Sequence, residues 1–208
     1  MAGCPVPLSG SVKILGVTLD QHLTFSDHMQ NVCKLSNYHT HALRHIRSSL
    51  TKDMERTVAC ALVNTGFDYC NSVLYHTTES NIAKLQRAQN ALARVVTNTR
   101  RTEHIRPVLE DLHWLPINYR IDYKLAILTY KIRATCCSAY LKPFIRVYVL
   151  SRQLRSSSMM LIMTEATKTE IARRSFSQAA PSVCNCLPYK IRKAETFERF
   201  RTSLRTHL

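Results

Sequence analysis

The stretch Ser80–Val96, SNIAKLQRAQNALARVV, decides the fold class of this chain. Its apolar residues recur at helical spacing and share one face of a helix, while its basic residues lie elsewhere on the surface. The apolar positions are Ile82, Leu85, Leu92 and Val95, and the basic positions are Lys84, Arg87 and Arg94. The spacing predicts an amphipathic helix, which is the clearest one in the sequence.

Four other segments carry apolar residues at steps of three and four. Ser26 and Thr51 are predicted N-caps of the first two, and Pro116 is a predicted first helical residue of the third. The predicted inward faces are Met29, Val32, Leu35, Ala42, Leu43, Ile46 and Leu50; Met54, Val58, Ala61 and Leu62; Ile117, Ile121, Leu125, Leu128 and Ile132; and, near the C-terminus, Phe197, Phe200 and Leu204. The chain therefore contains at least five predicted helices.

The remaining segments add little regular structure. Val12–Asp20, VKILGVTLD, alternates and is rich in β-branched residues, so it predicts a strand or a hairpin arm. Residues 149–190 are less regular: residues 149–166 predict a loop followed by an extended apolar run, and residues 175–188 predict a loop with turns. Glycine occurs four times in 208 residues, where roughly fifteen are average, which disfavours a sheet-rich fold with many tight turns. We predict a mainly α fold: a helical array with a short N-terminal strand or hairpin and an irregular segment before the C-terminal helix.

The net charge of +15 is unevenly distributed along the chain. Residues 1–83 carry six basic and six acidic side chains, residues 84–155 carry fourteen and four, and residues 156–208 carry nine and four. A neutral first part followed by a basic remainder favours contact with a polyanion, with nucleic acid ahead of an acidic membrane surface. The alternative is a basic, well-solvated surface without a specific partner.

The sequence shows no segment apolar enough to span a membrane and no signal peptide at its start. We therefore expect an intracellular protein, in the nucleus or the cytoplasm, whose eight cysteines are reduced thiols. None of the cysteines forms a C-x2-C pair, and His41 and His45 lack the glutamate of an HExxH site. We expect no metal and no cofactor.

The stretch Gly66–Asn71, GFDYCN, has the outline of a polymerase aspartate box. A polymerase site needs at least two carboxylates to hold two metal ions, and no second acid lies near Asp68. We therefore expect a packing element, in which Phe67, Tyr69 and Val73 point inward and the aspartate accepts hydrogen bonds. No catalytic residue is predicted here or elsewhere.

Basic and aromatic side chains alternate in the segment that follows Pro116. Lysine and arginine neutralise phosphates, and exposed aromatic rings can stack on bases. An equally acceptable interpretation is that the tyrosines belong to the core beside a solvated charged face. The residues are Tyr119, Arg120, Tyr123, Lys124, Tyr130, Lys131 and Arg133. We predict contacts from the basic residues to the phosphate backbone, without base readout.

Eight blocks of the sequence, in order from about Val12 to Leu208, resemble one protein family. The family is the reverse transcriptases of non-LTR (LINE-type) retrotransposons, of the jockey-like and chicken-repeat-like kind, in the region downstream of the catalytic palm. The blocks are VKILGVTLD, FDYCNSVLY, LQRAQNALARVV, HIRPVLEDLHWLP, RIDYKLAILTYK, LRSS, RRSFSQAAPSVCNCLP and FRTSLRTHL. One departure is Cys184, which stands where family members usually have tryptophan.

The resemblance implies a division of the chain into three parts. Residues 1–25 would be a palm-edge, primer-grip-like strand segment in which Leu15 and Gly16 lie near the primer strand. Residues 26–148 would be a helical thumb-like domain, and residues 149–208 an irregular C-terminal extension ending in a helix. In this family the metal-binding aspartates lie upstream of these blocks, and the intact polymerase uses Mg²⁺.

These observations predict a non-catalytic fragment of a retrotransposon RNA-directed DNA polymerase. It would hold an RNA/DNA template–primer through basic helices and would partner the upstream polymerase domain. The predicted phosphate contacts are Lys84, Arg87, Arg94, Arg100, Arg101, Arg120, Lys124 and Lys131. The alternative is a domesticated helical protein-interaction module with no nucleic-acid role, which docks a partner through its apolar stripes.

Overall fold

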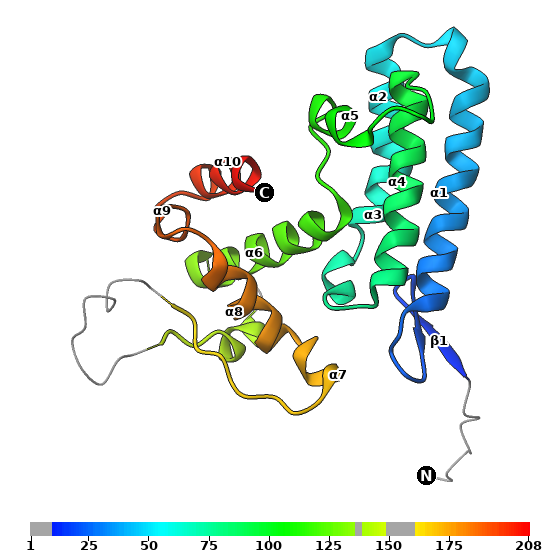
Figure 1. The fold of residues 1–208 in the computed structure, drawn as a ribbon. Helices are drawn as coiled ribbons and strands as arrows, with labels where there is room; N and C mark the ends of the chain where they lie inside the picture. Colours follow the sequence, from blue (N-terminus) through cyan, green and yellow to red (C-terminus); the bar gives the residue numbers. More distant parts are fainter. Residues whose placement is uncertain (1–9, 136–138, 149–160) are drawn as a thin grey trace. The chain divides into compact units, whose positions relative to one another are not determined.

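The computed structural model describes residues 10–135, 139–148 and 161–208, and these residues belong to two compact units (Figure 1). Unit 1 comprises residues 1–70 and 77–114, and unit 2 comprises residues 71–76 and 115–208. Residues 1–9 of the predicted palm-edge segment and residues 149–160 of the predicted extension, including the block LRSS, lie outside the described residues. Each unit is described below by itself.

Unit 1 begins with an antiparallel hairpin of β1 (Ser11–Ile14) and β2 (Val17–Asp20). Its two-residue turn has positive φ at both positions, 47° at Leu15 and 83° at Gly16. A turn of this hand matches the right-handed twist of the paired strands. Glycine adopts such a φ readily, whereas leucine does so at a conformational cost. The hairpin confirms the strand prediction.

Asp20 ties the end of the hairpin to the start of the first helix. Its carboxylate accepts hydrogen bonds from the backbone N–H groups of His22, Thr24 and Phe25 at 3.1, 2.9 and 2.6 Å. Phe25, in the left-handed conformation, is the N-cap residue, so the helix begins at Ser26 without a side-chain cap. The predicted cap at Ser26 is therefore wrong, because Asp20 organises the backbone that leads into the helix.

The helices of unit 1 form a bundle in which α1 runs along α4 and α2 packs against both (Figure 1). The core between them contains fully buried aliphatic side chains, and burying each one stabilises the fold by about 1.5–3 kcal/mol. These include Met29, Leu43, Leu85, Leu92 and Val95. The elements are α1 (Ser26–Ile46), a 3₁₀ turn (Arg47–Ser49), α2 (Lys52–Ala59), a π-helical turn (Cys60–Asn64), α3 (Thr65–Asp68), α4 (Glu79–Thr97) and α5 (Ile105–Asp111).

The predicted inward face of the second helix is wrong. Met54 and Leu62 are 55% and 49% exposed, whereas Ala59 and Val63 are buried. Thr51 caps α2 as predicted, through a hydrogen bond from the Met54 backbone N–H to its hydroxyl at 3.4 Å. The π-helical turn that follows α2 changes the angular step between residues, which accounts for the exposure of Leu62 within it, but not for that of Met54, which precedes it.

The first helix departs from its predicted face in a similar way. Met29 and Leu43 are buried, but Leu35 and Ile46 are 57% and 50% exposed. The buried face of α1 instead includes the polar residues Ser36 and Thr40. The Thr40 hydroxyl donates a hydrogen bond to the Ser36 carbonyl at 2.7 Å. A hydroxyl that bonds its own helix can be buried at little cost, because its hydrogen bond is satisfied.

The GFDYCN stretch is partly a packing element. Phe67 is buried, but Tyr69 and Val73 are 53% and 40% exposed, which contradicts their predicted inward placement. The helix ends at Asp68, and Tyr69 is already extended, so helical spacing no longer applies. The Tyr69 hydroxyl donates to the Leu15 carbonyl at 2.6 Å and so connects this stretch to the hairpin turn.

Unit 2 is built around α6 (Ile117–Thr135), which packs against η3 (Asn71–Leu74), α8 and α10. A cluster of Ala126, Leu187, Ile191, Phe200 and Leu204 forms part of its core. The Tyr130 ring stacks on the Phe200 ring with centroids 4.4 Å apart. The other elements are η4 (Ala139–Phe144), α7 (Glu170–Arg173), α8 (Phe176–Cys186), α9 (Tyr189–Arg192) and α10 (Phe197–His207).

The prediction of loop and turns across 176–186 is wrong, because this segment forms the helix α8. The misleading signals are Pro181 and the neighbouring serine and asparagine residues, which usually interrupt helices. Ala179, Ala180 and Pro181 are buried against the rest of unit 2, and this packing stabilises the helix. Tertiary contacts here override local propensity.

The described residues confirm the predicted fold class: a mainly helical chain with a short N-terminal two-strand hairpin. Residues 161–169, which precede α7, are largely without regular structure apart from an isolated bridge between Val147 and Ile162. Among the described residues, no helix is both long and apolar enough to cross a membrane.

Candidate nucleic-acid interface

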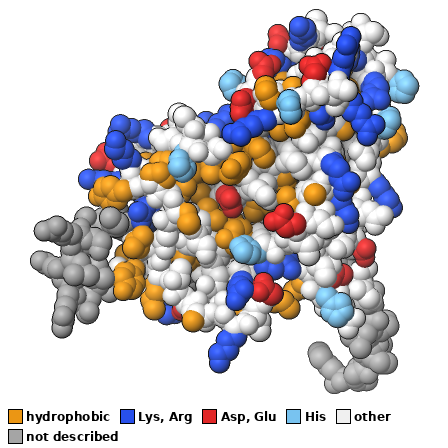
Figure 2. Space-filling model, viewed as in Figure 1, with side chains coloured by type: hydrophobic (Ala, Val, Ile, Leu, Met, Phe, Trp, Pro, Cys, Tyr) orange, Lys and Arg blue, Asp and Glu red, His pale blue; other side chains and the backbone are white. Residues whose placement is uncertain are grey.

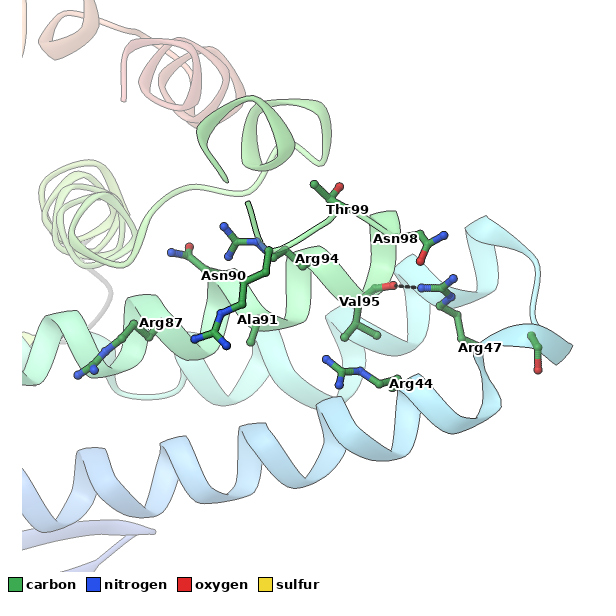
Figure 3. Close-up of a pocket in the computed structure, with 11 residues that line it drawn as sticks. Arg44, Arg47, Arg87, Asn90, Ala91, Arg94, Val95, Asn98 and Thr99 are labelled. Atoms are coloured by element: carbon green, nitrogen blue, oxygen red, sulfur yellow. Dashed lines mark hydrogen bonds between the residues drawn. The ribbon is translucent and has the colours of Figure 1, made fainter. Parts of the chain in front are cut away.

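A cleft of about 840 Å³ lies in unit 1 between the C-terminal part of α1 and the second half of α4 (Figure 3). Five arginines line it, together with small polar side chains, and no carboxylate is among its described lining residues. Arg44 reaches into the space between the two helices, and Arg87 and Arg94 extend from α4 (Figure 3). The lining residues are Arg44, Arg47, Ser48, Arg87, Asn90, Ala91, Arg94, Val95, Asn98, Thr99 and Arg101.

The sequence of α4 explains why its arginines reach this cleft. Leu85, Leu92 and Val95 are buried in the core, so the side chains of Arg87 and Arg94 project from other faces of the helix. Asn98 then ends α4 in the left-handed conformation. The chain turns there, which brings the following residues Thr99 and Arg101 to the same cleft.

Two of the arginines hold the cleft together. The Arg47 guanidinium donates to the Val95 carbonyl at 3.2 Å, which joins the end of α1 to α4. Its Nε also lies 3.8 Å from the Glu55 carboxylate, which is buried and needs a partner of opposite charge. Arg94 donates to the Glu103 carbonyl at 3.2 Å and so holds the loop that follows α4.

The other three arginines point their charges to solvent. Arg44, Arg87 and Arg101 are exposed, and none of them forms an ion pair within the part of the chain that the structure describes. The Nε of Arg87 donates to the Ala83 carbonyl of its own helix at 3.2 Å, which leaves its two terminal nitrogens outward. These three side chains can accept an anionic ligand without giving up an internal partner.

Basic side chains of α4 affect the pKa of the Cys33 thiol on α1. Burial raises the pKa of Cys33, and the nearby charges of Lys84 and Arg87 oppose that rise because they favour the thiolate.

Figure 2 shows Lys and Arg side chains spread along the bundle of α1 and α4. Guanidinium groups are rigid, planar donors that suit phosphate oxygens, so the cleft is suited to a phosphate-rich ligand.

The structure brings together three of the eight predicted phosphate contacts, Arg87, Arg94 and Arg101, in this cleft. Lys84 and Arg100 are exposed on unit 1 but do not line it. The prediction missed Arg44 and Arg47. Their spacing of three residues near the end of a helix was visible in the sequence, but their proximity to α4 depends on the fold.

The remaining predicted contacts lie on α6 in unit 2. Arg120 is only 9% exposed, and its Nε donates to the Leu115 carbonyl at 2.8 Å. Lys131 is exposed, with its ammonium 4.9 Å above the centre of the Phe197 ring. Lys124 is exposed and turned to solvent. Of the three, Lys124 is the one best placed to meet a phosphate.

Leu15 and Gly16, which the resemblance places near the primer strand, form the hairpin turn, and Leu15 is 83% exposed. His41 and His45 are exposed on α1. Among the described residues, no three side chains of histidine, cysteine, aspartate or glutamate lie close enough to hold a metal ion.

The chain shares sequence with a curated protein. A stretch of 98 residues is 30% identical to the probable RNA-directed DNA polymerase from transposon X-element of Drosophila melanogaster, and it covers 45% of this chain but 11% of that protein. The chain therefore spans a small part of the relative's length. No protein-family profile matches the chain, and no solved structure matches it. The chain is distantly related to a retrotransposon RNA-directed DNA polymerase.

Proposed function

We propose, from this distant relation, that the chain is the non-catalytic part of a retrotransposon polymerase that holds the RNA/DNA template–primer. The observation that carries the proposal is the cleft of unit 1, where five arginines gather and only one of them, Arg47, is paired with a carboxylate among the described residues. Positive side chains that converge in this way bind phosphates and confer no base specificity. Lys84 and Arg100 on unit 1 and Lys124 on unit 2 add further contacts to the nucleic-acid backbone.

In this proposal the chain positions nucleic acid, and the chemistry of synthesis takes place on the upstream polymerase domain, which is its protein partner. The thumb-like role and the closeness of Leu15 and Gly16 to the primer are parts of the same proposal. A primer-extension assay of the chain with Mg²⁺ is expected to show no nucleotide incorporation. Metal-dependent synthesis by this chain would overturn the non-catalytic assignment.

The binding proposal is tested by the salt dependence of affinity for a template–primer with a single-stranded template extension. Each neutralised phosphate contributes about −0.7 to −0.9 to the slope of log affinity against log salt concentration, so several contacts give a steep slope. The affinity is measured by fluorescence anisotropy over a range of NaCl concentrations. Salt-independent binding, or no binding at low salt, contradicts the proposal.

Substitution of two cleft arginines tests the site itself. Arg44→Gln and Arg101→Gln remove exposed charges that make no ion pair within the described residues, so the fold should not change. Each is expected to weaken template–primer binding by about tenfold, the usual effect of losing one charge-assisted contact. Lys34→Gln, at an exposed position of α1 outside the cleft, is the matched control and should retain binding.

A further inference from the structure

We infer that the cleft of unit 1 binds a single nucleic-acid strand through its phosphates, independently of its bases, and does not bind the duplex. This inference rests on the proposed function and specifies which part of a template–primer occupies the site. It assigns the single-stranded template extension to the cleft and leaves the duplex to basic residues outside it.

The width of the cleft favours one strand. It is a surface groove along the seam of α1 and α4, whose axes lie only about 8–10 Å apart because the two helices pack directly against each other. A nucleic-acid duplex is much wider than that, since its major groove alone is about 12 Å wide. A duplex can touch the rim of such a cleft, whereas an extended strand can enter it.

The length of the cleft favours a strand over an isolated phosphate. The lining residues on α4 run from Arg87 to Val95, which corresponds to about 12 Å along the helix axis, and Asn98 follows at the C-cap. Arg44 faces this wall from α1 (Figure 3). Arg87 and Arg94 on this wall and Arg44 on the opposite side match more than one phosphate, because one phosphate could contact only part of the set.

The chemistry of the lining favours contact with the backbone alone. No aromatic side chain is among the described residues that line the cleft, so it lacks the stacking platform of sites that hold bases. Guanidinium groups only donate hydrogen bonds, and phosphate oxygens only accept them. Contacts of this kind do not require the bases of the bound strand, so removal of the bases should not weaken binding.

The test compares three ligands of equal length: a thymidine-only DNA strand, a strand of abasic nucleotides and a blunt RNA–DNA hybrid. The full chain and the double variant Arg44→Gln/Arg101→Gln are titrated with each ligand at one salt concentration. The unmodified chain should bind the thymidine and abasic strands with affinities within about threefold of each other, since stacking is worth more than that per base where it contributes.

The double variant should lose about tenfold or more in affinity for both single strands and less than about threefold for the blunt hybrid. Lys34→Gln should leave all three affinities unchanged. Much weaker binding of the abasic strand by the unmodified chain, or an equal loss on the hybrid in the variant, overturns this inference while the proposed function stands. Failure of the unmodified chain to bind any of the three ligands overturns both.

Discussion

The helices α4 of unit 1 and α6 of unit 2 are of equal length, 19 residues, and both carry basic side chains that the sequence marks as phosphate contacts. On α4, Arg87, Arg94 and their neighbours line an open cleft. On α6, Arg120 is buried and Lys131 lies over an aromatic ring. The difference shows that the packing around a helix, more than the number of its charges, decides whether they remain available to a ligand.

The surroundings of the two helices account for this contrast. α4 packs against α1, α2 and α5, while its residues Arg87 and Arg94 line the cleft. α6 is contacted by η3, α8 and α10, and its apolar residues are spread more evenly around its circumference. α6 keeps exposed positions such as Lys124, whereas Arg120 lies among its buried residues.

The burial of the contact between α6 and α8 can be tested through the thiol of Cys184 on α8. Burial raises the pKa of Cys184 to about 11, although a hydrogen bond with Thr129 and the positive charges of Arg133 and Arg192 act in the opposite direction. The folded chain keeps this proton up to about pH 11, whereas the unfolded chain loses it above its ordinary value of 9.0. The free energy of unfolding should therefore fall by roughly 2–3 kcal/mol from pH 9 to pH 11 on account of this group.

The measurement is urea-induced unfolding of the unmodified chain and of Cys184→Ala at a series of pH values. The variant is less stable at every pH because it leaves a cavity, so the quantity to compare is the pH dependence. The steeper loss above pH 9 should be absent from the variant. Parallel pH profiles of the two proteins would show that the Cys184 thiol is not shielded beside α6.

A second prediction compares the effects of substituting Arg120 on α6 and Arg87 on α4. Arg120→Met removes the donor to the Leu115 carbonyl and is expected to lower the free energy of unfolding by about 1–2 kcal/mol, with nucleic-acid affinity unchanged. Arg87→Met removes an exposed charge and should do the reverse, weakening binding with little loss of stability. Urea unfolding and anisotropy titrations measure the two effects. If Arg120→Met lost affinity without losing stability, Arg120 would act in binding, as Arg87 is expected to do, and the proposed difference between the two helices would be wrong.

The fold class could be predicted from the sequence because long helices with one apolar face have a clear period. The bounds of α4 differ from its predicted ones by one residue at each end, and Thr51 was recognisable as the cap of α2. The prediction of buried faces from residue spacing failed where the backbone leaves the α-helical period, as in the π-helical turn after α2. It also failed for α8, where buried packing stabilises a helix that contains Pro181.

The cleft was only partly predictable for a different reason. Arg87, Arg94 and Arg101 lie within one short basic stretch, so their clustering is visible in the sequence. Arg44 and Arg47 come from a segment that is neutral overall, and they meet the others because α1 packs along α4. Helix pairing of this kind depends on tertiary contacts that no local pattern specifies. For Arg120, the even apolar distribution of α6 was the signal that could have indicated burial.

The smallest expected effect separates Lys131 from Lys124 on the same helix. Lys131→Gln removes the ammonium that lies 4.9 Å above the Phe197 ring and so should lower the free energy of unfolding by about 0.5–1 kcal/mol. Lys124→Gln, at an exposed position, should leave stability unchanged and slightly weaken binding of the hybrid. Urea unfolding and anisotropy titrations of both variants provide the comparison. Equal effects of the two substitutions on stability would mean that the ring contact does not hold Lys131, and that this lysine is as available to phosphate as Lys124.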